Sequence, residues 1–242
     1  MATHDNFEYD GDNSAVDVLK WAIEKFHPYI TISCSFEQPV TAHMALTINP
    51  DVKIFSIDTG RLPEETYECA TEFEKRFSPN IEWYFPKKEE VEKLVNEKGM
   101  YSFRESLNAR KECCGIRKVE PLRRQLNTLD AWVTGQRKDQ SPGTRNDVPV
   151  VQLDDAFEGR NGELVKFNPL ANWSSKDVWD YIRISEAPYN RLHERGFVSI
   201  GGEPCTRPVL PGQHEREGRW WWEEATQKEC GLHAGNLIAS DV

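Results

Sequence analysis

The sequence predicts a single α/β domain, in which helices flank a mostly parallel twisted sheet. Strand and helix patterns alternate in the first half, no repeat or linker divides the chain, and its 242 residues suffice for one core. Hydrophobic residues make up 38% and aromatic residues 11%, which argues against a disordered chain. We predict a flexible tail over 1–16, the α/β domain over 17–225 and a C-terminal segment over 226–242.

The alternation begins near the N-terminus. Apolar side chains at helical spacing predict a helix over 17–26, and a β-rich run predicts a strand over 29–34. Pro39 suits the first turn of a helix over 40–46, and a second strand follows over 52–58. The same order continues with a helix from Pro63, a strand over 81–85 and a helix over 87–98 that ends before Gly99.

The second half has fewer regular elements. We predict strands over 131–135 and 148–153, and Ser174 with Asp177 caps a helix that ends near Ser185. Beyond this helix the chain is rich in Gly, Pro, Arg and Trp, which is typical of a functional segment built from loops.

Composition excludes several classes of protein. With 30 basic and 40 acidic residues the chain has a formal charge of −10, which argues against a general nucleic-acid binder. No apolar run approaches the roughly 20 residues that cross a bilayer. Six cysteines in a chain of this length do not indicate a secreted disulfide framework. We therefore expect a soluble protein in a reducing compartment.

The charge is unevenly distributed along the chain. Residues 104–145 contain ten basic residues against five acidic ones. Arg207, Arg216 and Arg219 form a second basic group. A solvated helix face explains most runs of this kind, whereas a pocket for a small polyanion would use arginine pairs to bind phosphate or sulfate oxygens.

Three predicted strand ends offer groups that bind anions. They lie at 33–36, 57–60 and 133–137, and they present hydroxyls, backbone N–H groups and the cation of Arg137. In open parallel sheets ligands bind beyond the carboxyl ends of the strands. Together with the basic segment, these ends favour a nucleotide-like ligand.

Five motifs are specific enough to indicate a protein family. They are KECCGIRK (111–118), TGQRKDQSPGTR (134–145), GEPCTRPV (202–209), GQHEREGRWWW (212–222) and ECGLH (229–233). In this order they resemble the assimilatory adenylyl-sulfate (APS) reductases of plants and bacteria, over roughly residues 20–236. The resemblance implies an adenine nucleotide alpha hydrolase-like fold and the two-electron reduction of APS to sulfite and AMP, in sulfate assimilation toward cysteine.

The resemblance also implies roles for single residues. Cys230 would be the nucleophile, its thiolate attacking sulfur to give an S-sulfocysteine that a thioredoxin or glutathione-type thiol resolves. Lys228 and His233 lie close in sequence and favour the thiolate, and we count His233 as catalytic. For the phosphosulfate we select Lys118, Arg137, Arg207, Arg216 and Arg219, and for the adenosine Ser33, Ser35, Ile57, Asp58, Thr59, Gly60 and Arg61, with Trp220 as a further candidate.

The sequence departs from this family at the metal site. Relatives that reduce APS usually hold a 4Fe–4S cluster through a Cys-Cys pair and a later Cys-x-x-Cys, and such a cluster needs four thiolates. Cys113, Cys114 and Cys205 occupy three of these positions, but Gly202 replaces the fourth cysteine. We therefore predict no metal cofactor, with a labile or incomplete 4Fe–4S cluster as the alternative.

A second departure lies in the loop after the first strand. Relatives carry Ser-Gly-Ala or Ser-Gly-Gly there, whereas this chain has Ser35-Phe36-Glu37. Glycine allows close approach of a ligand, so we expect Phe36 and Glu37 to crowd or repel an anion. Binding would then depend more on the arginines, or the loop would take another shape.

Three other functions remain open at this stage. The chain could reduce 3′-phosphoadenylyl sulfate (PAPS), act as a degenerate nucleotide-binding redox sensor, or adenylate a substrate as ATP pyrophosphatases do. We expect no nucleic-acid or membrane partner, and a homo-oligomer is compatible with the sequence. The plastid stroma of a plant and the cytoplasm of a bacterium both fit.

Overall fold

The computed structural model describes residues 14–141 and 144–223. The longer elements, in chain order, are α1 (Ala15–Phe26), β1 (Ile30–Ser33), α2 (Val40–Ile48), β2 (Lys53–Ile57), α3 (Glu64–Phe77), β3 (Asn80–Tyr84), α4 (Lys88–Lys98), α5 (Leu107–Cys114), α6 (Glu120–Leu126), β4 (Ala131–Val133), β5 (Val151–Leu153), β6 (Val165–Phe167) and α7 (Ser175–Ser185). Short turns of helix are η1 (Ser102–Arg104), η2 (Gly115–Val119), η3 (Lys138–Gln140), η4 (Arg191–Arg195), η5 (Glu203–Cys205) and η6 (Glu215–Gly218). Within the described ranges, every helix is too short or too polar to cross a membrane.

The strands form one six-stranded sheet in the order β3-β2-β1-β4-β6-β5. All neighbouring strands are parallel except β5, which runs antiparallel to β6. In the central strands Ile32 lies opposite both Ile54 and Val133, and all three side chains are buried. Parallel strands are covered on both faces and read as continuous apolar runs, which explains why this part was predictable. The predicted mostly parallel sheet is confirmed.

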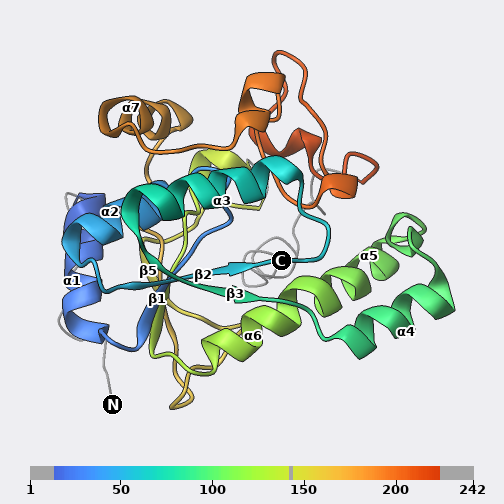
Figure 1. Ribbon diagram of the computed structural model, residues 1–242, viewed down its shortest axis with the longest axis horizontal. Coiled ribbons are helices and arrows are strands. Elements are labelled where there is room, and N and C mark those ends of the chain that lie inside the picture. Colours follow the sequence, from blue (N-terminus) through green and yellow to red (C-terminus); the bar gives the residue numbers. More distant parts are fainter. Residues whose placement is uncertain (1–13, 142–143, 224–242) are drawn as a thin grey trace.

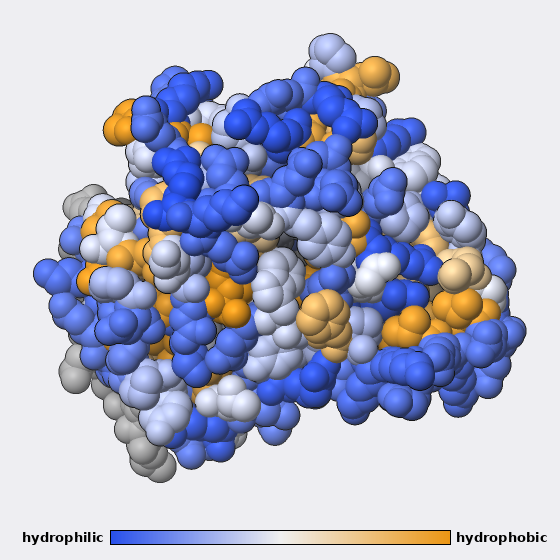
Figure 2. Space-filling model, in the orientation of Figure 1, coloured by the Kyte–Doolittle hydropathy of each residue, from blue (hydrophilic) through white to orange (hydrophobic). Residues whose placement is uncertain are grey.

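Two apolar clusters cover the two faces of the sheet. On one face α1, α2, α3 and α7 contribute side chains such as Leu19, Phe73 and Val178. On the other face Leu122 and Leu126 of α6 belong to a smaller cluster around β2 and β4. Figure 1 shows α1 and α2 apart from α6, which continues through α5 toward α4. The face of the molecule shown in Figure 2 is mostly hydrophilic, with small, separate hydrophobic areas.

Helix α1 begins within the predicted tail. The Ser14 side chain accepts a hydrogen bond from the backbone N–H of Asp17, and the Asp17 carboxylate accepts one from Ser14 N–H. This capping box satisfies donors that a helix N-terminus otherwise leaves open, so the helix starts at Ala15. Ser174 and Asp177 form the same arrangement at the start of α7, as predicted.

Two parts of the fold were not predicted. A helical run over 107–126 consists of α5, the π-helical turn η2 and α6, and charged residues and cysteines obscure its apolar face. Strand β6 was missed because Lys166, which is only 3% exposed, interrupts its apolar pattern. The strand expected over 148–153 is shortened to β5.

Candidate functional site

A cavity of about 230 Å³ opens beyond the carboxyl ends of β1, β2 and β4. This is the position where open α/β sheets bind ligands. Its lining includes hydroxyls, one acid and five cationic side chains: Ser33, Ser35, Glu37, Thr41, Thr59, Thr134, Gln136, Gln140, Ser199, Lys118, Arg137, Arg145, Arg216 and Arg219. Residues 33–42 and 199–219, which are far apart in the sequence, therefore meet at one edge of the sheet.

Four of the seven residues expected to bind adenosine line the cavity: Ser33, Ser35, Ile57 and Thr59. The others shape the surroundings. The Asp58 carboxylate accepts hydrogen bonds from Gly60 N–H at 2.7 Å and from the Tyr67 hydroxyl at 2.9 Å. The Arg61 guanidinium lies over the Phe103 ring and donates to the Met100 carbonyl at 2.6 Å. Asp58 and Gly60 thus fix the turn after β2, and Arg61 is turned toward η1.

The expectation that Phe36 crowds the ligand is wrong. Its φ of +52° lies in the left-handed region, where glycine is usual, and this turns the side chain into the core. There Phe36 is fully buried and stacks on Trp83 with ring centroids 5.7 Å apart. Glu37, by contrast, lines the cavity as expected.

The buried Asn190 holds this turn in place. Its amide nitrogen donates to the Phe36 carbonyl at 3.3 Å and to the Thr66 hydroxyl at 3.1 Å, and its backbone N–H donates to the Glu37 carbonyl at 3.1 Å. Such interlocking hydrogen bonds fix a loop between packed elements. The position of Glu37 in the cavity wall is therefore set by contacts with α3 and with the segment before η4.

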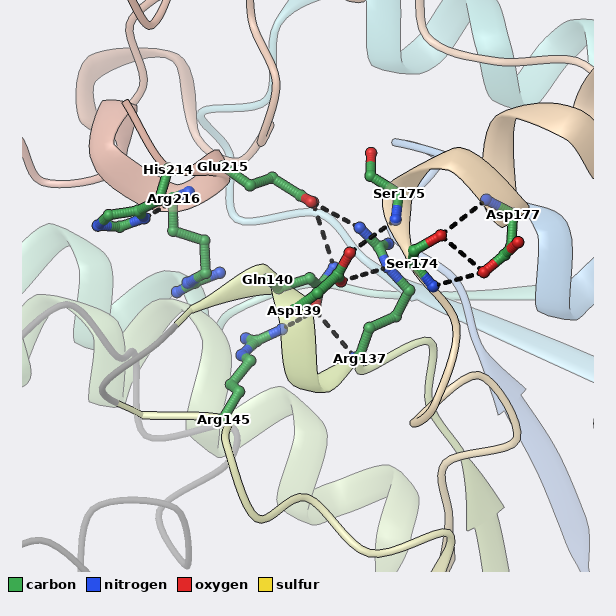
Figure 3. Close-up of polar contacts among 10 residues, drawn as sticks. All are labelled: Arg137, Asp139, Gln140, Arg145, Ser174, Ser175, Asp177, His214, Glu215 and Arg216. Atoms are coloured by element: carbon green, nitrogen blue, oxygen red, sulfur yellow. Dashed lines mark hydrogen bonds and ion pairs between the residues drawn. The ribbon is translucent and has the colours of Figure 1, made fainter. Parts of the chain in front are cut away.

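Arg137 lines the cavity, and two acidic side chains hold its guanidinium (Figure 3). Its Nη2 lies 2.6 Å from Glu215 Oε2, and its Nε lies 3.1 Å from Asp139 Oδ1. The second Asp139 oxygen accepts a hydrogen bond from the backbone N–H of Ser175, at the start of α7. The side chain of Arg137 is 3% exposed and that of Glu215 is 8% exposed. Arg137 thus joins three segments at the cavity wall.

Burial raises the pKa of Glu215 to about 7. Removal from water disfavours the carboxylate, and the nearby charges of Glu37 and Asp139 act in the same direction. The charges of Arg137 and Arg145 oppose the shift but do not cancel it. Glu215 was absent from the predicted site, because its pairing with Arg137 spans 78 residues of sequence.

Of the other predicted cations, Lys118, Arg216 and Arg219 line the cavity and Arg207 does not. Arg207 is exposed and lies over the Trp221 ring. Arg145 was counted in the basic segment but not chosen as a site residue, although it lines the cavity and is buried. Its place as the last residue of the motif TGQRKDQSPGTR could have identified it as a site residue.

Trp220 is the centre around which the cations gather. It is fully buried, and four cationic groups lie within 6 Å of its ring: Arg110 at 4.6 Å, Arg219 at 4.8 Å, Lys118 at 5.6 Å and Arg216 at 5.8 Å. The face of an indole attracts cations, so one ring orders several like charges. Trp220 does not line the cavity itself, but it contacts three of the cations that do.

Three cysteines converge beside this cation group. Cys205 contacts the apolar clusters of both Cys113 and Cys114. At Gly202 an added Cβ would lie 3.4 Å from the Arg61 carbonyl oxygen, so the position has room for a side chain but supplies no ligand. No group of three or more His, Cys, Asp or Glu arranged for a metal ion occurs in the described part of the chain. Burial raises the pKa of Cys205, which favours its neutral thiol. The donor set does not fit a four-thiolate cluster.

Cys230 and His233, the residues expected to carry the chemistry, lie outside the described residues. Of the remaining cysteines, Cys34 lines the cavity and Cys69 is in α3. Burial raises the pKa of Cys34 to about 12 and raises that of Cys69 as well. Both are therefore neutral thiols and poor nucleophiles at ordinary pH.

The sequence and the fold of this chain are similar to those of known proteins. The family described as phosphoadenosine phosphosulfate reductase domain matches residues 27–208. Adenosine 5'-phosphosulfate reductase of Pseudomonas aeruginosa (strain LESB58) is 55% identical over 229 residues, which cover 94% of this chain and 85% of that protein. The chloroplastic 5'-adenylylsulfate reductase 3 of Arabidopsis thaliana is 53% identical over 93% of this chain and 49% of its own length. The crystal structure of phosphoadenylyl-sulfate reductase from Candida auris, a phosphate complex, has a TM-score of 0.67 and 28% identity, covering 81% of this chain and 92% of that one.

Proposed function

Because this chain belongs to the phosphoadenosine phosphosulfate reductase domain family, we propose that it reduces adenylyl sulfate to sulfite and AMP in sulfate assimilation. The observation that carries this function is the cavity at the strand ends. There Lys118, Arg145, Arg216 and Arg219 place four cations around a space that would hold an anionic nucleotide. High identity to named APS reductases over nearly the whole chain agrees with this use of the cavity.

The reaction proceeds through a thiol. The Cys230 thiolate attacks the sulfur of the nucleotide, an S–S bond forms, the S–O bond breaks, and AMP leaves with the electron pair. A thiol of a thioredoxin or glutathione-type partner then attacks the Cys230 sulfur and releases sulfite. The resulting disulfide is reduced by a second thiol of the partner, so that two thiols supply the two electrons.

The cations stabilise the charge that grows on the AMP phosphate as the S–O bond breaks. Fixed cations aimed at a developing anion stabilise the transition state more than the ground state. Trp220 holds Lys118, Arg216 and Arg219 in position before the substrate arrives. Arg137 is held by Glu215 and Asp139, so its part is to hold the cavity wall together.

We propose that this reaction needs no iron–sulfur cluster. The support is the chemistry of the donor set, since Gly202 supplies no fourth thiolate. Gly202→Cys is a matched variant, because a Cβ fits there at an ordinary contact distance. After anaerobic reconstitution with iron and sulfide, the variant is expected to retain a cluster through gel filtration and the wild type is not. Retention of four irons per chain by the wild type would contradict the proposal.

The activity is tested by sulfite release from APS with thioredoxin, after treatment of the protein with a chelator. Steady turnover supports both the activity and its independence from a metal. Loss of turnover after chelation, restored by iron and sulfide, would overturn the cluster-free mechanism but not the activity. Tight APS binding without turnover under either condition would favour the nucleotide-binding redox sensor. We propose a reducing compartment, because the reaction needs free thiols; the named plant relatives are chloroplastic.

A further inference from the structure

The cavity is bordered by two groups of charged residues with opposite character. The cationic wall consists of Lys118, Arg216 and Arg219, around the buried Trp220. The acidic wall comprises Glu37, Arg137 and Arg145, which line the cavity, together with Asp139 and Glu215, which pair with Arg137 and do not line it. Figure 3 shows how most of the acidic wall is connected, with the Glu215 and Asp139 side chains both contacting the Arg137 guanidinium.

Of the residues in this wall that line the cavity in the described part of the chain, Glu37 is the one acid, beside the guanidinium groups of Arg137 and Arg145. The two cations are also engaged within the protein. Arg137 is held by Glu215 and Asp139, and Arg145 Nη1 donates to the side-chain oxygen of Gln140. A phosphate beside Glu37 would be repelled by its carboxylate, and Arg137, which two acidic side chains hold, would offset little of that repulsion.

Glu37 has an unsatisfied hydrogen-bond acceptor. Its Oε1 is buried and accepts no hydrogen bond from any residue in the described ranges. Its main chain, in contrast, is fixed through the hydrogen bond from Asn190 N–H. A buried carboxylate oxygen without a donor costs free energy, and a ligand that brings a donor recovers it. Hydroxyl groups donate, whereas a phosphate dianion does not.

We propose that Glu37 is the specificity-determining residue that selects adenylyl sulfate, with a free ribose 3′-hydroxyl, over its 3′-phosphorylated form. This inference rests on the proposed function, because it assumes that a sulfonucleotide occupies the cavity. The phosphosulfate lies toward the cationic wall, and the ribose hydroxyl donates to Glu37 Oε1. A 3′-phosphate loses this hydrogen bond and is repelled by the carboxylate, and such repulsion against a competing ligand is a common source of specificity.

The test compares the two nucleotides in Glu37→Gln, which keeps the size of the side chain and removes its charge. The kcat/KM for sulfite release is measured with each nucleotide and the same thioredoxin. The ratio of the two kcat/KM values is expected to shift about tenfold toward the 3′-phosphorylated nucleotide. The kcat/KM for adenylyl sulfate is itself expected to fall, because a neutral amide oxygen accepts a weaker hydrogen bond than a carboxylate oxygen, so the ratio of the two kcat/KM values is the deciding readout.

Binding provides a readout that does not depend on turnover. Competition between AMP and 3′-phosphoadenosine 5′-phosphate is expected to shift in the same direction and by a similar factor in the variant. Glu24→Gln, an exposed residue of α1, is the matched control and should leave both ratios unchanged. Should Glu37→Gln fail to fold in a thermal melt, Glu37→Ala serves the same comparison.

The outcomes separate this inference from the function on which it rests. If neither nucleotide yields sulfite with the wild type, the proposed function fails, and the binding competition still decides the role of Glu37. If the wild type reduces adenylyl sulfate but the Glu37 variants leave both ratios unchanged, only the inference is overturned. A wild type that prefers the 3′-phosphorylated nucleotide also overturns it.

Discussion

The sheet core and the site segment, residues 202–223, are stabilised in different ways. Around the sheet, apolar side chains such as Ile54 and Phe73 are fully buried in layers between strands and helices. The site segment instead contains the short turns η5 and η6 and is held by the buried pair Arg110–Glu223 and by cations around Trp220. The core depends on apolar burial, which sequence periodicity reveals, whereas the site segment depends on charged partners that are far apart in sequence.

The largest effect is expected from a variant that removes the attacking thiolate and leaves the sheet core and the site segment intact. Cys230→Ser should lower sulfite formation from adenylyl sulfate by about 1,000-fold or more, because a hydroxyl is a far weaker nucleophile than a thiolate. Binding of AMP and thermal stability should stay close to wild type. Undiminished turnover of the variant would show that another residue attacks the sulfur.

The next largest effect is expected from a variant that breaks the buried ion pair Arg110–Glu223, which holds the site segment. Glu223→Gln leaves the Arg110 side chain, which is 1% exposed, without its carboxylate partner, and should lower the free energy of unfolding by about 3 kcal/mol. Urea unfolding measures this loss. The matched control is Glu112→Gln, in the exposed pair with Lys98, whose cost should stay below about 1 kcal/mol. Equal costs for the two variants would contradict the special role of the buried pair.

Glu215 should make the stability of the protein depend on pH. Its pKa is raised from 4.5 to about 7, so the folded state binds the proton more tightly than the unfolded state. Protonated Glu215 stabilises the folded state by roughly 3 kcal/mol at most. This stabilisation is fully present below pH 4.5 and is lost as pH rises through about 7. Urea unfolding at about pH 5 and about pH 8 should show this fall in the wild type and a smaller one in Glu215→Gln. An identical pH dependence in the two proteins would exclude Glu215 as its source.

The smallest effect belongs to the core. Ile54→Val removes one methylene from a fully buried side chain of β2 and should cost about 1 kcal/mol in unfolding free energy. The preference between the two sulfonucleotides should be unchanged, since the substitution touches neither wall of the cavity. A change in that preference would mean that the sheet core and the site are more tightly coupled than their contacts indicate.

The sequence allowed good prediction where one local pattern decides the structure. Helix α1 and strands β1 and β2 follow from apolar spacing, and the cavity at the strand ends follows from the parallel sheet. Strand β6 was missed because Lys166 is buried within it, and the left-handed turn at Phe36 was misread because glycine is the usual residue there. Tertiary packing overrode the local preference in both cases.

The site was predicted less completely than the fold, for a physical reason. The motifs indicated Lys118, Arg216 and Arg219, and all three line the cavity. They could not show that Glu215 holds Arg137, because Glu215 reaches it from a distant segment. The motifs also did not show that Trp220 organises the cations from behind, since a sequence carries no information on which face of a ring is covered.

The π-helical turn η2 sets the phase between the two helices that it joins. Each residue added to or removed from a helix rotates everything beyond it by about 100°. Cys113 and Cys114 precede this turn, and Lys118 lies within it. Deleting one residue from 115–119 would remove the π-helical turn and shorten the spacing between the two cysteines and Lys118. The length of this single turn thus sets where Lys118 lies relative to Cys113 and Cys114.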